Sequence, residues 1–372
     1  MLLLVASQGG SLSLGGMLCA LYGLASAIGQ PVLGRLVDRR GQTLVTSAAV
    51  IVTTGCLLLL PLTSAADQPG VAAAVVTLAG LSTPPLEAGL RALWPHVLPD
   101  PERQRAALAL DTGSQGLIYV VGPPLVAALV TATGPGAAMV ATAVLSLTGA
   151  AAVLTAQPSR HWAPAPAAKT GALGPLRHGG LRLLFLALTG VGFALGAMNV
   201  WAVAMADRFE TGLLSGLIPA ALSVGSLAGG FLYGRRSWPG TITRQLLTAA
   251  AAFAVGWLPL TATPGPIAAT ALTAVPGLFL TALITSAFLT VDALAPAGTT
   301  TEAYAWLIAS VGVGEAAGTA LAGGLAAHPF AGPALPAAGA AVCLAVLIGA
   351  RRRITTAGVT TRRRGRHRRT TA

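Results

Sequence analysis

Long apolar runs separated by short polar connections make up most of this chain. A helix that crosses a bilayer needs about 20 mainly apolar residues, and eleven runs approach or exceed that length. Lipid offers no hydrogen-bond partners to the backbone, so each run is predicted to be a helix. The expected spans are residues 12–33, 44–63, 71–90, 108–130, 137–155, 181–205, 213–233, 246–260, 267–291, 304–326 and 335–350.

The composition favours a surface that faces lipid. Of the 372 residues, 54% are hydrophobic and only 9% are charged. Soluble domains carry roughly 25% charged residues, because their surface has to face water. We therefore predict an all-α, polytopic membrane protein. Its cysteines, Cys19, Cys56 and Cys343, lie inside apolar runs and show no metal-ligand spacing, so no metal or other cofactor is expected.

The basic residues mark one side of the membrane. The net charge is +12, and every Lys and Arg except Arg208 falls on alternate connections or in the C-terminal segment. By the positive-inside rule, these parts are cytoplasmic. The charge therefore reports topology, and no nucleic-acid partner is expected. The predicted location is a bacterial inner (plasma) membrane, crossed many times, with a cytoplasmic C-terminus.

The longest connection divides the chain into two halves. It predicts an N-terminal membrane half at 1–156, a cytoplasmic loop at 157–180, a C-terminal half at 181–350 and a basic cytoplasmic tail at 351–372. The tail is either a site for anionic lipids or a disordered anchor. A repeat links the halves, since Gly29, Gly34 and Arg35 recur as Gly229, Gly234 and Arg235, and duplicated halves are common in transporters.

One connection carries a recognisable motif. The segment Gly34-Arg35-Leu36-Val37-Asp38-Arg39-Arg40-Gly41 closely resembles the loop motif of the major facilitator superfamily. Thr43 departs from it where a basic residue is usual, and the second copy, Gly234-Arg235-Arg236, lacks the Asp. The resemblance implies two six-helix halves and transport by alternating access. It also implies a gate at the cytoplasmic rim formed by Gly34, Arg35, Asp38, Arg39 and Gly41.

The physical roles in this motif follow from residue type. Gly34 allows two helices to approach closely, and Asp38 can accept hydrogen bonds from Arg39 or from the N-terminus of a neighbouring helix. The alternative is that the arginines only fix the orientation of the chain. Family members begin with a full span before the one that leads into this motif, and this chain has only residues 1–8 at that place. We therefore expect the first helix to be largely missing, through a start codon assigned too late or a truncation.

Charged and polar residues inside spans are costly and are therefore candidate functional residues. Glu87 and Arg91 are four residues apart, so they can pair on one helix face. The alternative to a functional role is a pair that only neutralises charge near the cytoplasmic interface, with Arg91 extending toward the membrane surface. Asp111, Gln115 and Tyr119 form one polar stripe. We expect this stripe to face a central cavity, although Asp111 could instead join the charges at the rim.

Glu315 lies in the middle of a span and is the main candidate for proton coupling. Its alternative role is to hydrogen-bond between helices. Asn199 and Trp201 are weaker cavity candidates, and Trp201 could instead face lipid. The proton-antiport signature of the family includes an Arg that is absent from residues 71–80. This absence argues against the usual drug–proton antiport mechanism.

The sequence therefore predicts a secondary transporter and not an enzyme, since no catalytic or phosphate-binding motif is present. Its expected partners are a small-molecule substrate, protons and membrane lipids. Efflux is the favoured direction, by family analogy. Two alternatives stay open: an uptake permease for a sugar or metabolite, and a non-transporting membrane partner or sensor.

Overall fold

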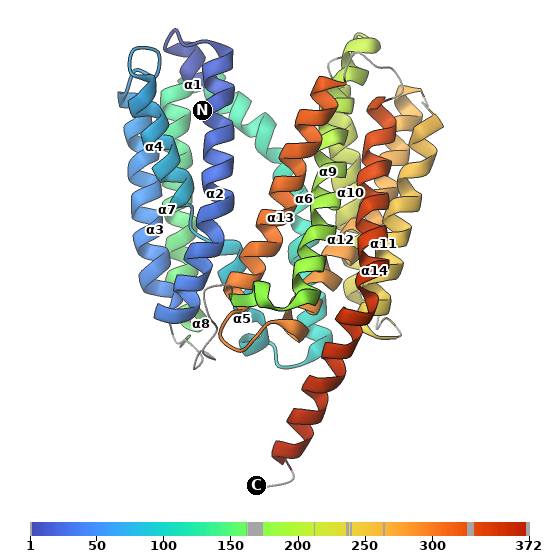
Figure 1. Cartoon of the computed structure of the whole chain (residues 1–372). Coiled ribbons are helices and arrows are strands. Elements are labelled where there is room, and N and C mark those ends of the chain that lie inside the picture. The colour runs from blue at the N-terminus through green and yellow to red at the C-terminus, as the bar shows by residue number, and fades with distance from the viewer. Residues whose placement is uncertain are drawn as a thin grey trace. The chain divides into compact units, whose positions relative to one another are not determined.

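The computed structural model describes residues 2–160, 162, 174–211, 213–235, 238, 240–262, 265–325 and 331–369. In this part of the chain every regular element is a helix (Figure 1). The α-helices are α1 (Leu2–Ser7), α2 (Leu12–Arg40), α3 (Gln42–Leu59), α4 (Pro69–Leu81), α5 (Leu86–Val97), α6 (Pro101–Thr133), α7 (Pro135–Thr155), α8 (Gln157–Arg160), α9 (Gly179–Arg208), α10 (Leu214–Arg235), α11 (Ile242–Trp257), α12 (Pro266–Leu294), α13 (Thr300–Gly324) and α14 (Ala331–Arg369). Short 3₁₀ helices are η1 (Leu60–Leu62), η2 (Gly174–Arg177) and η3 (Leu258–Ala262).

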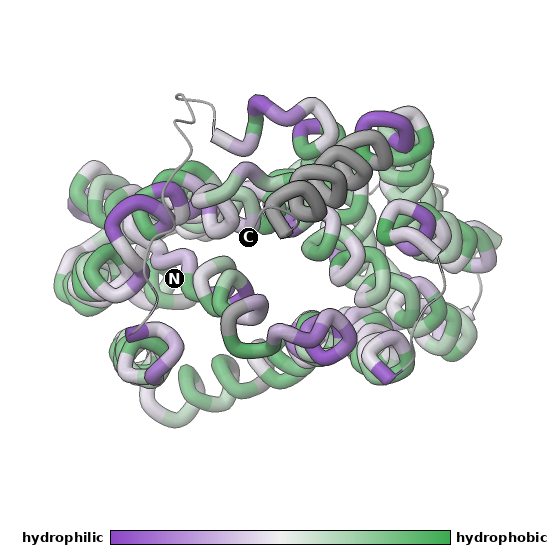
Figure 2. The backbone as a smooth tube through the Cα atoms, turned by 90° about the horizontal axis from the view of Figure 1, so that it is seen from below, coloured by the Kyte–Doolittle hydropathy of each residue, from purple (hydrophilic) through white to green (hydrophobic). Residues whose placement is uncertain are grey.

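The predicted all-α membrane fold is confirmed. Among the described residues, ten helical segments are long and apolar enough to cross a membrane, and α6 covers the remaining expected run at 108–130. Most of the backbone carries apolar residues, and hydrophilic segments are visible at the ends of several helices that face the viewer (Figure 2). The last helix extends past the expected end at residue 350, and its backbone continues through the basic segment to Arg369.

One expected span is interrupted. Residues 71–90 were predicted to form a single helix, but α4 ends at Leu81 and α5 starts at Leu86. Two consecutive prolines lie in the gap, and proline both lacks an N–H and disfavours helical backbone before it. The freed carbonyl of Ser82 accepts a hydrogen bond from Thr53 Oγ1 of α3 at 2.7 Å. A hydroxyl from a neighbouring helix thus satisfies the interrupted backbone.

The chain forms two compact units. Unit 1 consists of Met1–Val97, Gly122–Gly171 and Ala297–Ala309, and unit 2 of Leu98–Val121, Ala172–Pro296 and Ser310–Ala372. Within unit 1, α4 packs on α2, and α3 packs on α7. Within unit 2, α9 packs on α14, and α12 on α10 and α11. Each unit also contains the beginning of one helix from the other half of the sequence, namely α13 in unit 1 and α6 in unit 2.

The internal repeat is visible in how the helices pack within each unit. In unit 1, a side chain at Gly29 would collide with the carbonyl of Leu81 on α4. In unit 2, a side chain at Gly229 would collide with the carbonyl of Leu278 on α12. The reciprocal contacts match as well, with Gly80 against the carbonyl of Tyr22 and Gly277 against that of Leu222.

A second repeat was missed by the sequence analysis. The sequence Leu-Pro-Leu-Thr ends α3 at residues 60–63 and ends α11 at residues 258–261. Both copies form a 3₁₀ turn. In both, the threonine hydroxyl donates to the carbonyl of the first leucine, at 2.9 Å from Thr63 and 2.7 Å from Thr261. The two halves therefore share local structure beyond the predicted glycines.

Candidate functional site

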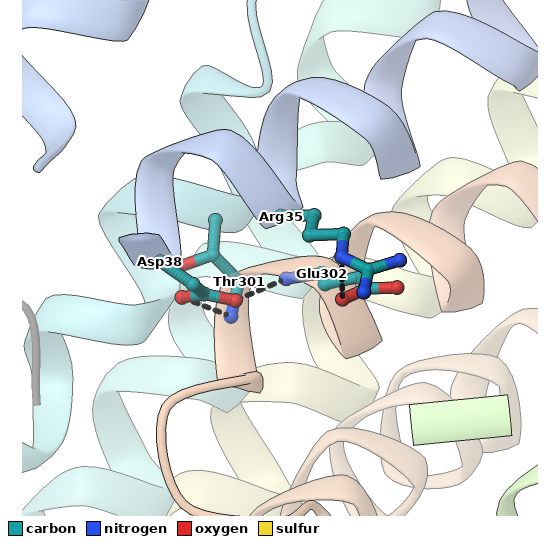
Figure 3. Close-up of polar contacts among 4 residues, drawn as sticks. All are labelled: Arg35, Asp38, Thr301 and Glu302. Atoms are coloured by element: carbon teal, nitrogen blue, oxygen red, sulfur yellow. Dashed lines mark hydrogen bonds and ion pairs between the residues drawn. The ribbon is translucent and has the colours of Figure 1, made fainter. Parts of the chain in front are cut away.

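Asp38 caps a helix that lies more than 260 residues away in sequence. Its carboxylate is buried and accepts hydrogen bonds from the backbone N–H of Thr301 at 3.1 Å and of Glu302 at 2.8 Å (Figure 3). These N–H groups belong to the first turn of α13, where no intrahelical acceptor exists. The partial positive charge at a helix N-terminus also favours a carboxylate. Of the two partners expected for Asp38, the helix N-terminus is the one found.

The two glycines of the motif have separate geometric reasons. A Cβ added at Gly34 would lie 3.0 Å from the carbonyl oxygen of Thr301 and 3.1 Å from Cα of Glu302. The missing side chain therefore lets α2 and the start of α13 approach closely. Gly41 ends α2 with a φ of 96°, and its N–H donates to the Val37 carbonyl at 2.9 Å. That φ strongly favours glycine.

The arginines of the motif are more exposed than its carboxylate. Arg35 Nε lies 3.9 Å from Oε2 of Glu302, whose side chain is 7% exposed. Arg39 and Arg40 are exposed in the last turn of α2, where positive charge is favourable. Sequence reasoning missed Thr301 and Glu302 as part of this site. The available signal was an acidic residue in the first turn of a span, after a connection that was expected to be cytoplasmic although it lacks arginine.

The second copy of the motif makes a neutral contact. A side chain at Gly234 would lie 3.4 Å from Cα of Ala106 in the first turns of α6, which belong to the same unit. Trp238 stands where the repeat would place the Asp. Its Nε1 donates to the Tyr233 carbonyl at 3.1 Å, and its ring stacks on that tyrosine at 5.4 Å. The unit 2 contact therefore relies on close packing and lacks the carboxylate cap.

Glu87 and Arg91 form the predicted pair. Nη1 of Arg91 lies 2.5 Å from Oε1 of Glu87, and the arginine side chain is 1% exposed. The pair fits both interpretations, so whether it serves transport or only neutralises charge stays a prediction. Both residues lie in α5, beyond the break at residues 82–85.

The polar stripe on α6 is only partly described. Asp111 and Gln115 are half-buried, and the Tyr119 side chain lies outside the described part of the structure. A side chain at Gly113 would lie 3.4 Å from the carbonyl oxygen of Ser226 on α10. Helical spacing places Asp111 and Gln115 on the other side of α6 from Gly113. Whether the stripe faces a cavity stays a prediction.

Glu315 and Asn199 come together within unit 2. The Asn199 Nδ2 donates to Oε1 of Glu315 at 3.4 Å, and both residues are half-buried. Their helices are nearly in backbone contact, because side chains at Gly192 and Gly314 would collide with the carbonyls of Val311 and Thr189. The contact is of the kind expected for the alternative role of Glu315, a hydrogen bond between helices. Proton coupling at this residue stays a prediction.

Trp201 is 5% exposed. Its ring lies 2.8 Å from where a side chain at Gly332 would begin. The alternative that it faces lipid is therefore wrong.

A sequence profile of the Major Facilitator Superfamily matches residues 1–318. The chain belongs to this superfamily. A search of curated proteins found no match by sequence.

Several solved transporter structures share this fold. The human organic anion transporter MFSD10 (TETRAN) superposes with a TM-score of 0.69 at 15% identity, covering 93% of this chain and 87% of the other. A bacterial homologue of the iron transporter ferroportin, in an outward-facing state, superposes with a TM-score of 0.63 at 14% identity, covering 94% of this chain and 91% of the other. The Major Facilitator Superfamily transporter FucP, in the outward conformation, superposes with a TM-score of 0.63 at 16% identity, covering 90% of this chain and 89% of the other.

These matches fix the fold as that of a multi-pass transporter family. The contact around Asp38 consists of hydrogen bonds from the first turn of α13 to a carboxylate on α2. It is a buried ionic cap that joins a helix from each half of the sequence, and it can be made or broken without a covalent step.

Proposed function

We propose that this chain is a secondary active transporter that moves a small solute by alternating access, in a bacterial inner membrane and with its C-terminus in the cytoplasm. The observation that carries the proposal is the Asp38 cap on α13. Hydrogen bonds to a charged group contribute about 1.5–3 kcal/mol each. Two such bonds are strong enough to favour one state and weak enough to break during a transport cycle.

The cap and the Gly34 contact act as a gate in this proposal. When they form, α2 and α13 close the cytoplasmic end and the substrate site faces outward. When the end of α13 leaves Asp38, the carboxylate and the helix N-terminus gain water in place of one another. Arg35 remains near Glu302 only in the closed state. Opening to the cytoplasm therefore exchanges protein hydrogen bonds for hydration.

Glu315 is the proposed coupling group. A carboxylate inside a span can bind a proton and lose its charge, and acidic residues so placed mark proton pathways. Asn199 can donate to the ionised carboxylate through its N–H₂ and can accept from the protonated form through its carbonyl. The pair thus accommodates both protonation states. Export is the proposed direction, and it rests on family analogy.

The test uses purified protein in liposomes with an imposed proton gradient. Candidate organic anions and amphiphilic cations are screened for binding by thermal shift, and proton flux that depends on the bound compound is then recorded. We expect Glu315→Gln to abolish coupled flux and Asp67→Asn to leave it unchanged, because Asp67 is bonded only locally to Ser64 on an exposed turn. Equal flux in both variants would remove Glu315 from the mechanism. Absence of flux with every bound compound would contradict the transport proposal.

A further inference from the structure

Two arginines converge at one end of unit 2. Arg182 lies in the first turn of α9, and Arg353 lies on α14. A side chain at Gly179 would lie 3.6 Å from Nη1 of Arg353 and 3.8 Å from Nη2 of Arg182. Both arginines are exposed. Like charges held this close repel each other, and among the described residues no carboxylate forms an ion pair with either one.

The pair lies at the level where the apolar spans begin and end. The span on α9 starts at Gly179, and the span on α14 ends at Ile354. These two helices pack against each other (Figure 1). By length and hydropathy, both arginines therefore lie at the ends of apolar segments, and the ends of a span are where lipid headgroups are expected. Leu186, one turn further into the span on the face of Arg182, is 54% exposed and offers an apolar surface to an acyl chain.

The neighbouring groups add no negative charge. Arg177 is exposed immediately before α9. His178 is the N-cap residue of that helix and makes no side-chain cap bond. Burial lowers the pKa of His178 below its usual value, so its imidazole is neutral at neutral pH. Among the described residues, the positive charge of this patch therefore comes from arginines.

We propose that Arg182 and Arg353 together bind the phosphate of an anionic phospholipid headgroup. Guanidinium groups present paired N–H donors that fit phosphate oxygens, and anionic lipids concentrate near basic groups at the cytoplasmic surface. The occupant supplies a counter-charge that no described residue provides at this point. None of the residues assigned to gating or coupling takes part, so this proposal stands independently of the transport mechanism.

The test measures lipid binding to the purified full-length chain in a neutral detergent. Native mass spectrometry follows the fraction of protein that carries phosphatidylglycerol or phosphatidylcholine during a titration, and thermal unfolding is recorded with each lipid and with inorganic phosphate. We expect the natural chain to bind phosphatidylglycerol about tenfold more tightly than phosphatidylcholine. The double variant R182Q/R353Q should lose about tenfold in affinity for phosphatidylglycerol.

The matched control is Arg244→Gln, which removes one exposed arginine from the first turn of α11. It should change the affinity by less than about twofold. The variant R182K/R353K keeps the charge, loses the paired donors and should fall in between. Equal binding of the two lipids by the natural chain overturns the proposal without any variant. Loss of affinity in Arg244→Gln as large as in the double variant, or stabilisation by inorganic phosphate that equals that by phosphatidylglycerol, also overturns it.

Discussion

A single buried carboxylate connects two distant parts of this sequence. Asp38 is 3% exposed, and its two oxygens are both used by backbone N–H groups of α13. A buried charge is tolerated only when such partners exist. The residue is therefore stable only while the start of α13 stays in place, which makes it sensitive to any movement of that helix.

We expect Asp38→Asn to loosen the contact between α2 and α13. The amide keeps one acceptor but loses the charge, and its N–H₂ opposes the helix N–H groups. The loss should be about 1–3 kcal/mol. A cysteine placed at Ala305, which is buried beside Gly34, should be alkylated by a water-soluble maleimide at least about tenfold faster in Asp38→Asn than in Asp67→Asn. Equal rates would contradict the cap assignment.

Arg35→Gln should have a much smaller effect in the same assay. The guanidinium is partly exposed, and its Nε lies 3.9 Å from Glu302, which is too far for a direct hydrogen bond. A loose ion pair with one partly hydrated partner contributes about 0–1 kcal/mol. We expect the alkylation rate at position 305 to change by no more than about fivefold. A larger change than in Asp38→Asn would show that the ion pair, and not the cap, holds the contact.

At the scale of helices, the sequence identified nearly every element, because apolar length alone indicates a span. It did not identify the break between α4 and α5. Prolines are common in membrane helices and are often tolerated there. What makes the break possible here is the hydroxyl of Thr53 on another helix, and that contact is a tertiary one. The partnership of Asp38 with Glu302 escaped for the same reason, although the Asp38 motif itself was recognised.

The glycine contacts between α9 and α13 can be tested with two variants of one helix. A side chain at Gly314 would collide with the Thr189 carbonyl, whereas Gly312 has no atom within 4 Å of the corresponding position. We expect Gly314→Ala to cost about 1–3 kcal/mol through overpacking. Gly312→Ala should be neutral or stabilising, because alanine favours the helix. Thermal unfolding in detergent measures both, and equal shifts would contradict the close packing.

At the scale of the whole molecule, the distribution of arginine predicts a topology that stays a prediction. The apolar runs, together with the motif at Gly34–Gly41, predicted the family fold that the superfamily match shows. The division into two compact units was not predicted in its details. Each unit includes the start of a helix from the other half of the sequence. Hydropathy identifies spans but carries no information on which helices pack together, so this exchange of helix ends could only come from the structure.

The topology itself can be tested with single cysteines in a chain that lacks Cys19, Cys56 and Cys343. A cysteine at Ser64 should react with an impermeant maleimide in intact cells. A cysteine at Arg244 should react only after the membrane is permeabilised, because arginine-rich connections stay cytoplasmic. Labelling of both positions in intact cells would invalidate the assigned orientation.

Gly29 and Gly80 in one unit correspond to Gly229 and Gly277 in the other, and a side chain added at any of the four would collide with a backbone carbonyl. These contacts limit which substitutions the protein tolerates. In a saturation library selected for insertion and folding, variants with larger side chains should be depleted to a similar extent at all four sites, because each pair has the same steric limit. Positions 38 and 238 should not follow one another, because aspartate at one and tryptophan at the other serve different chemistry. The two halves therefore share their helix packing, whereas the residues at positions 38 and 238 make different contacts.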